Sequence, residues 1–302
     1  MSLIEERVEV PARKPTLSDI RWEGMVTAVS PISHGDGTLG TTTLFRRGKV
    51  VQPGGVPERV PLVSGNGVRG VLRRMSSDTT RVLLGNPMWE MPTFQAMTSG
   101  GSLTKTSSPL KSGDIQRIRD LVPHLSLFGF AAGGRIVSGR TRVAEMIPVC
   151  VETAHILPPA LAGHPHLEVS AEDLLENREF SRLDETGGST RMGQISGGAV
   201  AADDSTNQMR FGAQLVAAGT VFSWGLDGDA LTPVERAHLV AALNLWAEHG
   251  CVVGGRSAAG LGRLQVELDG WSSSSRGEVP ALLAEHYTSH SDEISEVLGW
   301  LS

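Results

Sequence analysis

Alternation of apolar and polar positions predicts β-strands in several parts of the chain. In the segment WEGMVTAVSPI, Trp22, Val26 and Ile32 fall on even positions, the two-residue period of a strand with one buried face. The segments with this alternation, or with the β-branched and aromatic composition of strands, are residues 22–32, 135–149, 209–224 and 264–268. Glycines within residues 209–224 predict a bend or a bulge there.

Two helices are predicted, each by a signal at its N-terminus. The sequence TPVE at residues 232–235 forms a capping box with proline at the first helical position, and an apolar stripe follows it. The other helix follows a short strand or turn at residues 60–63. There Ser64 or Asn66 can cap a helix that begins among glycines and continues as VLRRM.

The order of these elements is β-α-β-β-α-β, the split βαβ or ferredoxin-like pattern of an α+β fold. We expect one domain over residues 1–302. Its predicted parts are a core at 22–84, 120–150 and 209–268, two large insertions at about 85–119 and 151–208, and a helical tail at 276–302. The first insertion is rich in Gly, Pro, Ser and Thr and lacks sustained periodicity, which predicts an irregular surface segment.

Charge is distributed unevenly along the chain. The net charge is -6 at pH 7, but residues 65–145 contain eleven Lys and Arg against five Asp and Glu, a net +6 that leaves -12 for the rest. Arginine dominates the cations, with 23 Arg against 4 Lys, and its planar fork suits phosphate, although a genome rich in G and C gives the same bias. An acidic chain can therefore still contain a basic surface for nucleic acid.

The cysteines and the N-terminus favour a cytoplasmic protein without membrane contact. Cys150 and Cys251 are too few for a disulfide framework, a CxxC redox pair or a four-thiolate zinc site, which favours a reducing compartment. The N-terminal MSLIEERVEVPARKP is too charged for a signal peptide. No run approaches the roughly 18 apolar residues of a membrane span.

Glycines at the start of the first helix form one candidate binding loop. Gly65, Gly67 and Gly70 spell G-x-G-x-x-G, but the repeated βα units expected around a dinucleotide site are missing. A nucleotide-binding oxidoreductase is therefore kept only as a control hypothesis. A helix N-terminus with free amides, next to Arg69 and Arg73, instead predicts an anion site. A tight turn without a ligand is the alternative.

A second glycine cluster, GGRSAAGLGR at residues 254–263, follows the other helix. It offers backbone amides, a hydroxyl and two guanidinium groups but lacks the Gly-Lys-Ser/Thr ending of a P-loop. The alternative is that its glycines only return the chain tightly to the sheet. Two such loops, each next to one helix of a split βαβ core, are expected on the same side of the sheet. Together they predict a basic groove for a phosphate backbone.

Candidate catalytic and metal-binding residues are few. Ser33, His34 and Asp36 share a flexible loop and can do acid–base chemistry on an RNA 2′-hydroxyl, although such residues also simply form turns. Three histidines within residues 155–166 lie among prolines without a thiolate pair, which is a poor zinc signature. We expect no metal and no cofactor.

Two apolar residues, Met192 and Ile195, lie in the polar, Gly-rich part of the second insertion. Apolar tips on a polar hairpin can wedge between bases. They can equally dock into a neighbouring subunit.

Five segments together carry a family resemblance that covers roughly residues 22–268. They are residues 25–40 with their Gly-rich loop, PLVSGNGVRGVLRR at 61–74, LFG at 127–129, AAGTVFSW at 217–224 and VVGGRSAAGLGRLQV at 252–266. With them the chain resembles the RAMP superfamily of CRISPR-associated proteins. It is most similar to the backbone subunit that polymerises along the guide RNA in class 1 effector complexes, of the type IV kind.

The resemblance implies a palm of RNA-recognition-motif type whose two insertions are fingers and a thumb hairpin. It also implies that several copies form a filament on one guide RNA (crRNA), with target nucleic acid and other CRISPR effector subunits as further partners. The residues then expected to bind RNA are Ser64, Gly65, Asn66, Arg69, Arg73, Gly255, Arg256 and Ser257, with Met192 and Ile195 as the thumb wedge.

The same resemblance bears on catalysis. RNA-cleaving relatives place an Asp in the loop after the first strand, whereas this chain has Thr43 near that place and Asp36 lies too early. We therefore expect a scaffold that does not cleave its target. The alternative is an endoribonuclease of the same superfamily, metal-dependent or metal-independent, that uses His34 and Asp36.

Overall fold

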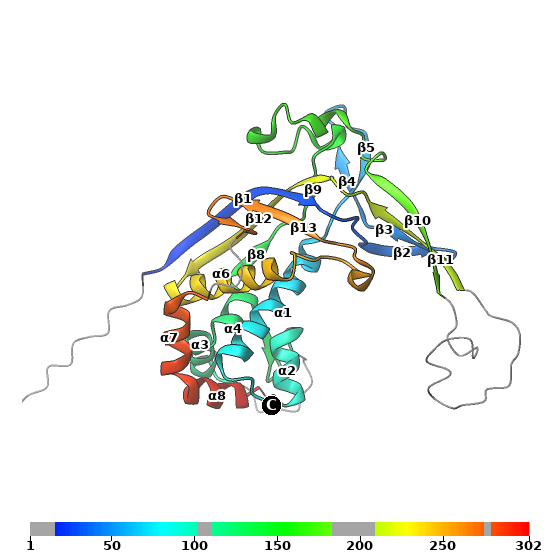
Figure 1. Ribbon diagram of the computed structural model, residues 1–302. Helices are drawn as coiled ribbons and strands as arrows, with labels where there is room; N and C mark the ends of the chain where they lie inside the picture. The colour runs from blue at the N-terminus through cyan, green and yellow to red at the C-terminus, as the bar shows by residue number, and fades with distance from the viewer. Residues whose placement is uncertain (1–15, 102–109, 183–208, 275–278, 302) are drawn as a thin grey trace, which may run out of the picture.

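The computed structural model describes residues 16–101, 110–182, 209–274 and 279–301 (Figure 1). Its strands form mostly antiparallel sheets, and the helices gather on one side of the largest sheet. The α+β class predicted from the sequence is confirmed. In the part of the chain that the structure describes, no helix is both long and apolar enough to cross a membrane.

The largest sheet is built around β1, whose alternating side chains bury Trp22 and Val26 on one face. Its strand order is β14-β13-β1-β12-β8, each neighbouring pair is antiparallel, and β9 also pairs with β12. Its strands are β1 (Ser18–Ala28), β8 (Thr141–Val143), β9 (Ile147–Pro148), β12 (Val221–Leu231), β13 (Leu264–Leu268) and β14 (Trp271–Ser272).

Two long helices pack against this sheet and complete the main core. They are α1 (Gly65–Leu83) and α6 (Pro233–Glu248). Both begin as predicted: Ser64 is the N-cap of α1, and the Thr232 hydroxyl accepts from the backbone N–H of Glu235 at the start of α6. Trp246 of α6 packs edge-on against Trp224 of β12, with ring centroids 5.9 Å apart. Burial of these apolar faces holds the helices to the sheet.

A smaller four-stranded sheet lies at one end of the main sheet (Figure 1). Its order is β10-β11-β3-β2, with β11 parallel to β3 and the other pairs antiparallel. Its strands are β2 (Gly35–Leu39), β3 (Thr42–Phe45), β10 (Leu175–Arg182) and β11 (Met209–Val216). Separate hairpins are β4 (Arg47–Val51) with β5 (Pro57–Pro61) and β6 (Phe130–Ala132) with β7 (Arg135–Val137). Short 3-10 helices precede β10: η1 (Val151–Thr153), η2 (Pro159–Leu161) and η3 (Pro165–Glu168).

Two strand predictions differ from the structure. Residues 209–224 are not one bent strand but β11 and β12, which lie in different sheets; Gly219, with a φ of 89°, lies in the turn between them. Residues 135–149 are divided into β7, β8 and β9. Gly139 lies so close to the Leu127 carbonyl oxygen that a Cβ would be 2.3 Å from it, and the chain leaves the strand direction there.

The described part of the first insertion is largely helical rather than irregular, so the expectation of an irregular segment was wrong there. Within residues 85–119, Met97 and Ile118 are fully buried on helices. These two residues belong to a second hydrophobic core, separate from the main one. Its helices are α2 (Met91–Thr98), α3 (Ser112–Leu121), α4 (Pro123–Phe128), α7 (Ala281–Ser289) and α8 (Ser291–Gly299). An eight-residue helix such as α2 is too short to give a sustained period, and contacts distant in sequence bury it. The last two helices agree with the predicted helical tail.

A buried polar network joins the two cores. His124 Nε2 lies 2.7 Å from the Met97 carbonyl oxygen, which can only accept, so Nδ1 accepts from the Ser76 hydroxyl at 2.7 Å. Ser76 Oγ accepts from His238 Nε2 at 2.7 Å, and Tyr287 OH lies 3.4 Å from His238 Nδ1. These hydrogen bonds fit the neutral form of both histidines. Burial lowers the pKa of His124 well below 6.5 and the pKa of His238 to about 3.

Candidate nucleic-acid interface

The N-terminus of α1 forms the first candidate loop. Ser64 Oγ accepts from the backbone N–H three residues later at 3.2 Å, and His34 Nε2 accepts from the backbone N–H of Ser64 at 3.1 Å. Gly65 has no room for a side chain, because a Cβ would lie 2.3 Å from the Val143 carbonyl oxygen. Asn66 is exposed at this helix end. The first N–H groups of a helix lack intrahelical acceptors, so this end can receive an anion.

The second candidate loop, residues 254–263, packs against the turn after β1. Gly254 has a φ of 76°, and a Cβ on it would lie 2.2 Å from the Ser33 carbonyl oxygen. Gly255 donates its N–H to the same oxygen at 2.7 Å. Ser257 is exposed and begins the 3-10 helix η4 (Ser257–Ala259). The two glycines therefore allow the chain to pass close to the Ser33 carbonyl oxygen. The residues that follow, beginning with the half-buried Arg256 and the exposed Ser257, lie at the surface.

The two loops converge on adjacent residues. Ser33 contacts the loop after α6, and His34 contacts the N-cap of α1. Burial, and then the nearby Arg46, lower the pKa of His34, whereas Asp36 acts in the opposite direction. A neutral imidazole can accept the N-cap hydrogen bond. The predicted placement of both loops on one side is thus a property of the fold.

Two predicted RNA-binding arginines are turned inward. Arg73 is buried and donates to the carbonyl oxygens of Ala96, Phe128 and Gly129; Arg69 also donates to Phe128 O, at 2.5 Å. Burial, and then the charge of Arg69, lower the pKa of Arg73 to about 10. Both guanidinium groups bond carbonyl oxygens at the C-terminal end of α4, where Arg73 is buried and Arg69 is half-buried.

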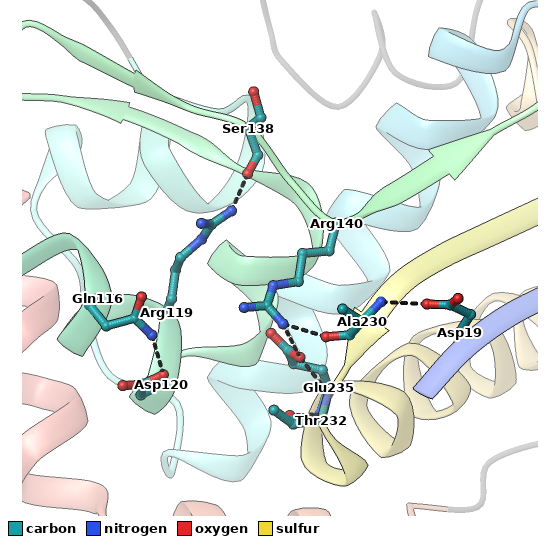
Figure 2. Close-up of polar contacts among 9 residues, drawn as sticks. All are labelled: Asp19, Gln116, Arg119, Asp120, Ser138, Arg140, Ala230, Thr232 and Glu235. Carbon is teal, nitrogen blue, oxygen red and sulfur yellow. Dashed lines mark hydrogen bonds and ion pairs between the residues drawn. The ribbon is translucent and has the colours of Figure 1, made fainter. Parts of the chain in front are cut away.

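Other arginines of the basic stretch at residues 65–145 are also used within the chain. Figure 2 shows Arg119 donating to a backbone carbonyl oxygen at 2.6 Å. It also shows Arg140 donating to the Ala230 carbonyl oxygen at 2.5 Å, beside the buried carboxylate of Glu235 at the N-terminus of α6. The net charge of this stretch therefore overestimates its cationic surface.

Arg256 differs from these arginines because, among the described residues, its guanidinium donates to no backbone carbonyl oxygen. Its backbone is left-handed, with φ 60° and ψ 30°, and its side chain is half-buried. Its guanidinium donates to Thr43 Oγ1 at 3.5 Å. Among the described residues it forms no ion pair with a carboxylate. Its positive charge is not compensated by an acid within the described chain.

A hollow of about 320 Å³ is lined by residues that, apart from Asp36 and Gly37 in the Gly-rich loop, are not predicted from the sequence as site residues. It is lined by Asp36, Gly37, Leu44, Phe45, Arg47, Arg59 and Gln214. Arg47 pairs with Glu172 at 2.7 Å, whereas Arg59 forms no ion pair among the described residues. These side chains come from β2, β3, β4, β5 and β11, so no local sequence signal marks them.

The candidate catalytic pair is not assembled. His34 Nε2 already accepts from Ser64, and Asp36 pairs with Arg46 at 3.0 Å. Within the described residues no group of three or more His, Cys, Asp or Glu is arranged to hold a metal ion. Met192 and Ile195, the predicted thumb wedge, lie outside the described residues.

Comparison with known proteins identifies a structural relative. A chain in a structure described as "Type IV-B CRISPR Complex" aligns with a TM-score of 0.57 and 27% sequence identity, over 86% of this chain and 94% of that chain. The crystal structure of Thermofilum pendens Csc2 aligns with a TM-score of 0.38 and 14% identity, over 94% of this chain and 79% of that one. No protein-family model and no curated protein matches the chain.

The first of these likenesses extends over nearly the whole described fold. The resemblance to CRISPR-associated subunits, expected from the sequence, is confirmed.

Proposed function

We propose that this chain is a crRNA-binding backbone subunit of a CRISPR effector ribonucleoprotein, and that copies of it oligomerise along the guide RNA in the cytoplasm. The observation that carries the proposal is the convergence of the two glycine loops at Ser33 and His34. There the N-terminal amides of α1 and the uncompensated Arg256 offer donors to a phosphate backbone. The 27% identity to a chain of a type IV-B CRISPR complex supports this assignment.

The arrangement of the main sheet supports a ferredoxin-like, RNA-recognition-motif type of palm. With β8 and β9 as the second strand of that pattern, the order β13-β1-β12-β8 is the 4-1-3-2 order of a split βαβ fold. In this assignment α1 and α6 are the two crossover helices. We infer that the second sheet and the helical core are the insertions that adapt this palm to an assembly.

The proposed RNA contacts are fewer than the sequence predicts. They are Ser64, Gly65, Asn66, Gly255, Arg256 and Ser257. We leave Arg69 and Arg73 out of the proposed RNA contacts, because their guanidinium groups donate to carbonyl oxygens at the end of α4. We propose that the subunit presents its guide to target nucleic acid, beside other effector subunits, without cutting the target.

Purification from a bacterial host that expresses a guide RNA tests this function. If copies cover equal lengths of RNA, nuclease treatment leaves protected fragments in regular steps, and negative-stain images show crescent or helical filaments. Arg256→Ala should weaken the binding, while Arg74→Ala, an exposed neighbour on α1, serves as the matched control. An RNA-free monomer, or a smear without steps, would contradict the proposal.

A further inference from the structure

The guanidinium group of Arg256 lies against two aromatic rings. Phe180 of β10 and Phe211 of β11 are directly opposite each other in the ladder, and their rings stack with centroids 5.6 Å apart at 12°. The Arg256 Cζ atom is 4.8 Å from the Phe180 centroid and 4.7 Å from the Phe211 centroid. The cation therefore contacts the π-faces of both rings at once.

The backbone of Arg256 is fixed independently of these rings. A left-handed φ of 60° is uncommon for a residue with a Cβ and costs energy that the surrounding contacts must offset. Gly255 anchors the loop to the Ser33 carbonyl oxygen, and Leu261 packs with Leu215 of β11. The loop is thus anchored on both sides of Arg256, to the turn after β1 at Ser33 and to the four-stranded sheet at Leu215.

The contacts of Arg256 leave most of its donors free. A guanidinium has five N–H groups, and the one side-chain hydrogen bond found for Arg256 in the described chain is the 3.5 Å contact to Thr43. Aromatic faces attract a cation without using its N–H groups and without cancelling its charge. By contrast, Arg47 gives two N–H groups to the Glu172 carboxylate. Phe180 and Phe211 hold Arg256 in one orientation, and its charge stays available to an anion.

We propose that Phe180 and Phe211 are positioning residues for RNA binding, which hold the Arg256 guanidinium in the plane that receives a phosphate oxygen of the guide. This inference rests on the proposed function. Phosphate contact belongs to Arg256, and the two rings act through it. The β10–β11 pair is thereby linked to the glycine loop at the point where RNA binds.

Salt titrations of RNA binding separate the two roles. With the full chain and a fluorescein-labelled oligouridylate, Arg256→Ala should weaken binding and lower the slope of log K against log salt concentration by about 0.7, the loss of one phosphate contact on a single strand. Phe180→Leu and Phe211→Leu should each weaken binding about fivefold. They should leave the wild-type slope unchanged, because the cation is still present.

Three further variants make the test decisive. Phe180→Tyr and Phe211→Tyr keep a π-face and should retain wild-type affinity, and Phe211→Leu should cost little more when Arg256→Ala is already present. Wild-type affinity in both Leu variants, or a Leu effect that adds fully to that of Arg256→Ala, would overturn the inference. Far-UV circular dichroism and thermal melts identify the variants that fold. If only one of the two Leu variants folds, the binding data from that variant are sufficient for the test. Wild-type protein that does not bind the oligomer would instead overturn the proposed function.

Discussion

Arg73 and Arg256 both lie near a glycine-rich helix boundary, and the sequence predicts RNA binding for both of them. In the structure, Arg73 is buried on α1 and donates to the Ala96 carbonyl oxygen of α2 and to two carbonyl oxygens at the end of α4. Arg256 is half-buried on a loop, lies against two rings and, within the described residues, makes one side-chain hydrogen bond, to Thr43. We therefore expect Arg73 to stabilise the fold and Arg256 to bind an anion.

On the proposed function, the difference implies that availability of donors, and not residue type or net charge, decides which arginines can bind RNA. A guanidinium that satisfies buried carbonyls cannot leave them without a desolvation cost at each oxygen. A guanidinium held by aromatic faces can add a phosphate and keep its existing contacts. The two regions should therefore respond oppositely to mutation: stability changes at the first and RNA affinity changes at the second.

Replacement of Arg73 should give the largest effect. Arg73→Ala removes the donors of Ala96 O and Gly129 O and leaves Phe128 O with Arg69, so we expect the free energy of unfolding to fall by about 4 kcal/mol. Urea denaturation measures this loss. The matched control is Arg74→Ala, an exposed neighbour, with a change below about 0.5 kcal/mol. A loss in Arg73→Ala no larger than in the control would show that its hydrogen bonds do not stabilise the fold.

Acid should destabilise the same buried region. His238 has a pKa of about 3 in the folded protein and 6.5 as the unperturbed value, so the unfolded chain binds the extra proton first as the pH falls. The stabilisation from the neutral form is present above pH 6.5 and is lost progressively between pH 6.5 and about 3. At pH 5 His238 alone should cost about 2 kcal/mol of unfolding free energy. His124, whose pKa is also lowered, adds to this loss.

Urea titrations at pH 7 and pH 5 measure this dependence. His238→Gln removes the titrating group and should flatten the pH dependence, even if it lowers stability at pH 7. His249→Gln is the control, because His249 is exposed at the end of the same helix, α6. An unchanged pH dependence in His238→Gln would assign the acid sensitivity to other groups.

Local signals in the sequence were sufficient for some elements and not for others. The N-cap at Ser64 and the capping box at residues 232–235 identified the starts of α1 and α6, because caps are determined by neighbouring residues. The glycines of residues 254–263 predicted a tight loop for the same local reason, and its binding role stays a prediction. The inward turn of Arg73 and the rings under Arg256 depend on residues more than 20 positions away. Spacing and composition do not encode such contacts.

Thr43→Asp should reduce the binding capacity of Arg256. The Thr43 hydroxyl lies 3.5 Å from the guanidinium, so a carboxylate there would pair with Arg256 and compete with phosphate. We expect about tenfold weaker RNA binding, with a salt slope lowered as in Arg256→Ala. Fluorescence anisotropy over a salt series checks this. The control is Thr43→Asn, because Asn has the shape of Asp without its charge, and it should keep an RNA affinity near that of the wild type. An equal loss of affinity in Thr43→Asn would indicate a steric effect.

The smallest effect is expected at Asp36, the carboxylate of the candidate catalytic pair. Asp36 forms an ion pair with Arg46 at 3.0 Å, and both side chains are substantially exposed, so Asp36→Ala should change stability by less than about 0.5 kcal/mol. Cleavage of RNA needs a group that activates the 2′-hydroxyl or a metal-held water, and His34 Nε2 is already bonded to Ser64. Guide-loaded protein should therefore leave a complementary RNA intact on a gel, with or without divalent metal, in the wild type and in Asp36→Ala alike. Periodic cuts by the wild type that disappear in Asp36→Ala, while RNA binding persists, would instead support the endoribonuclease alternative.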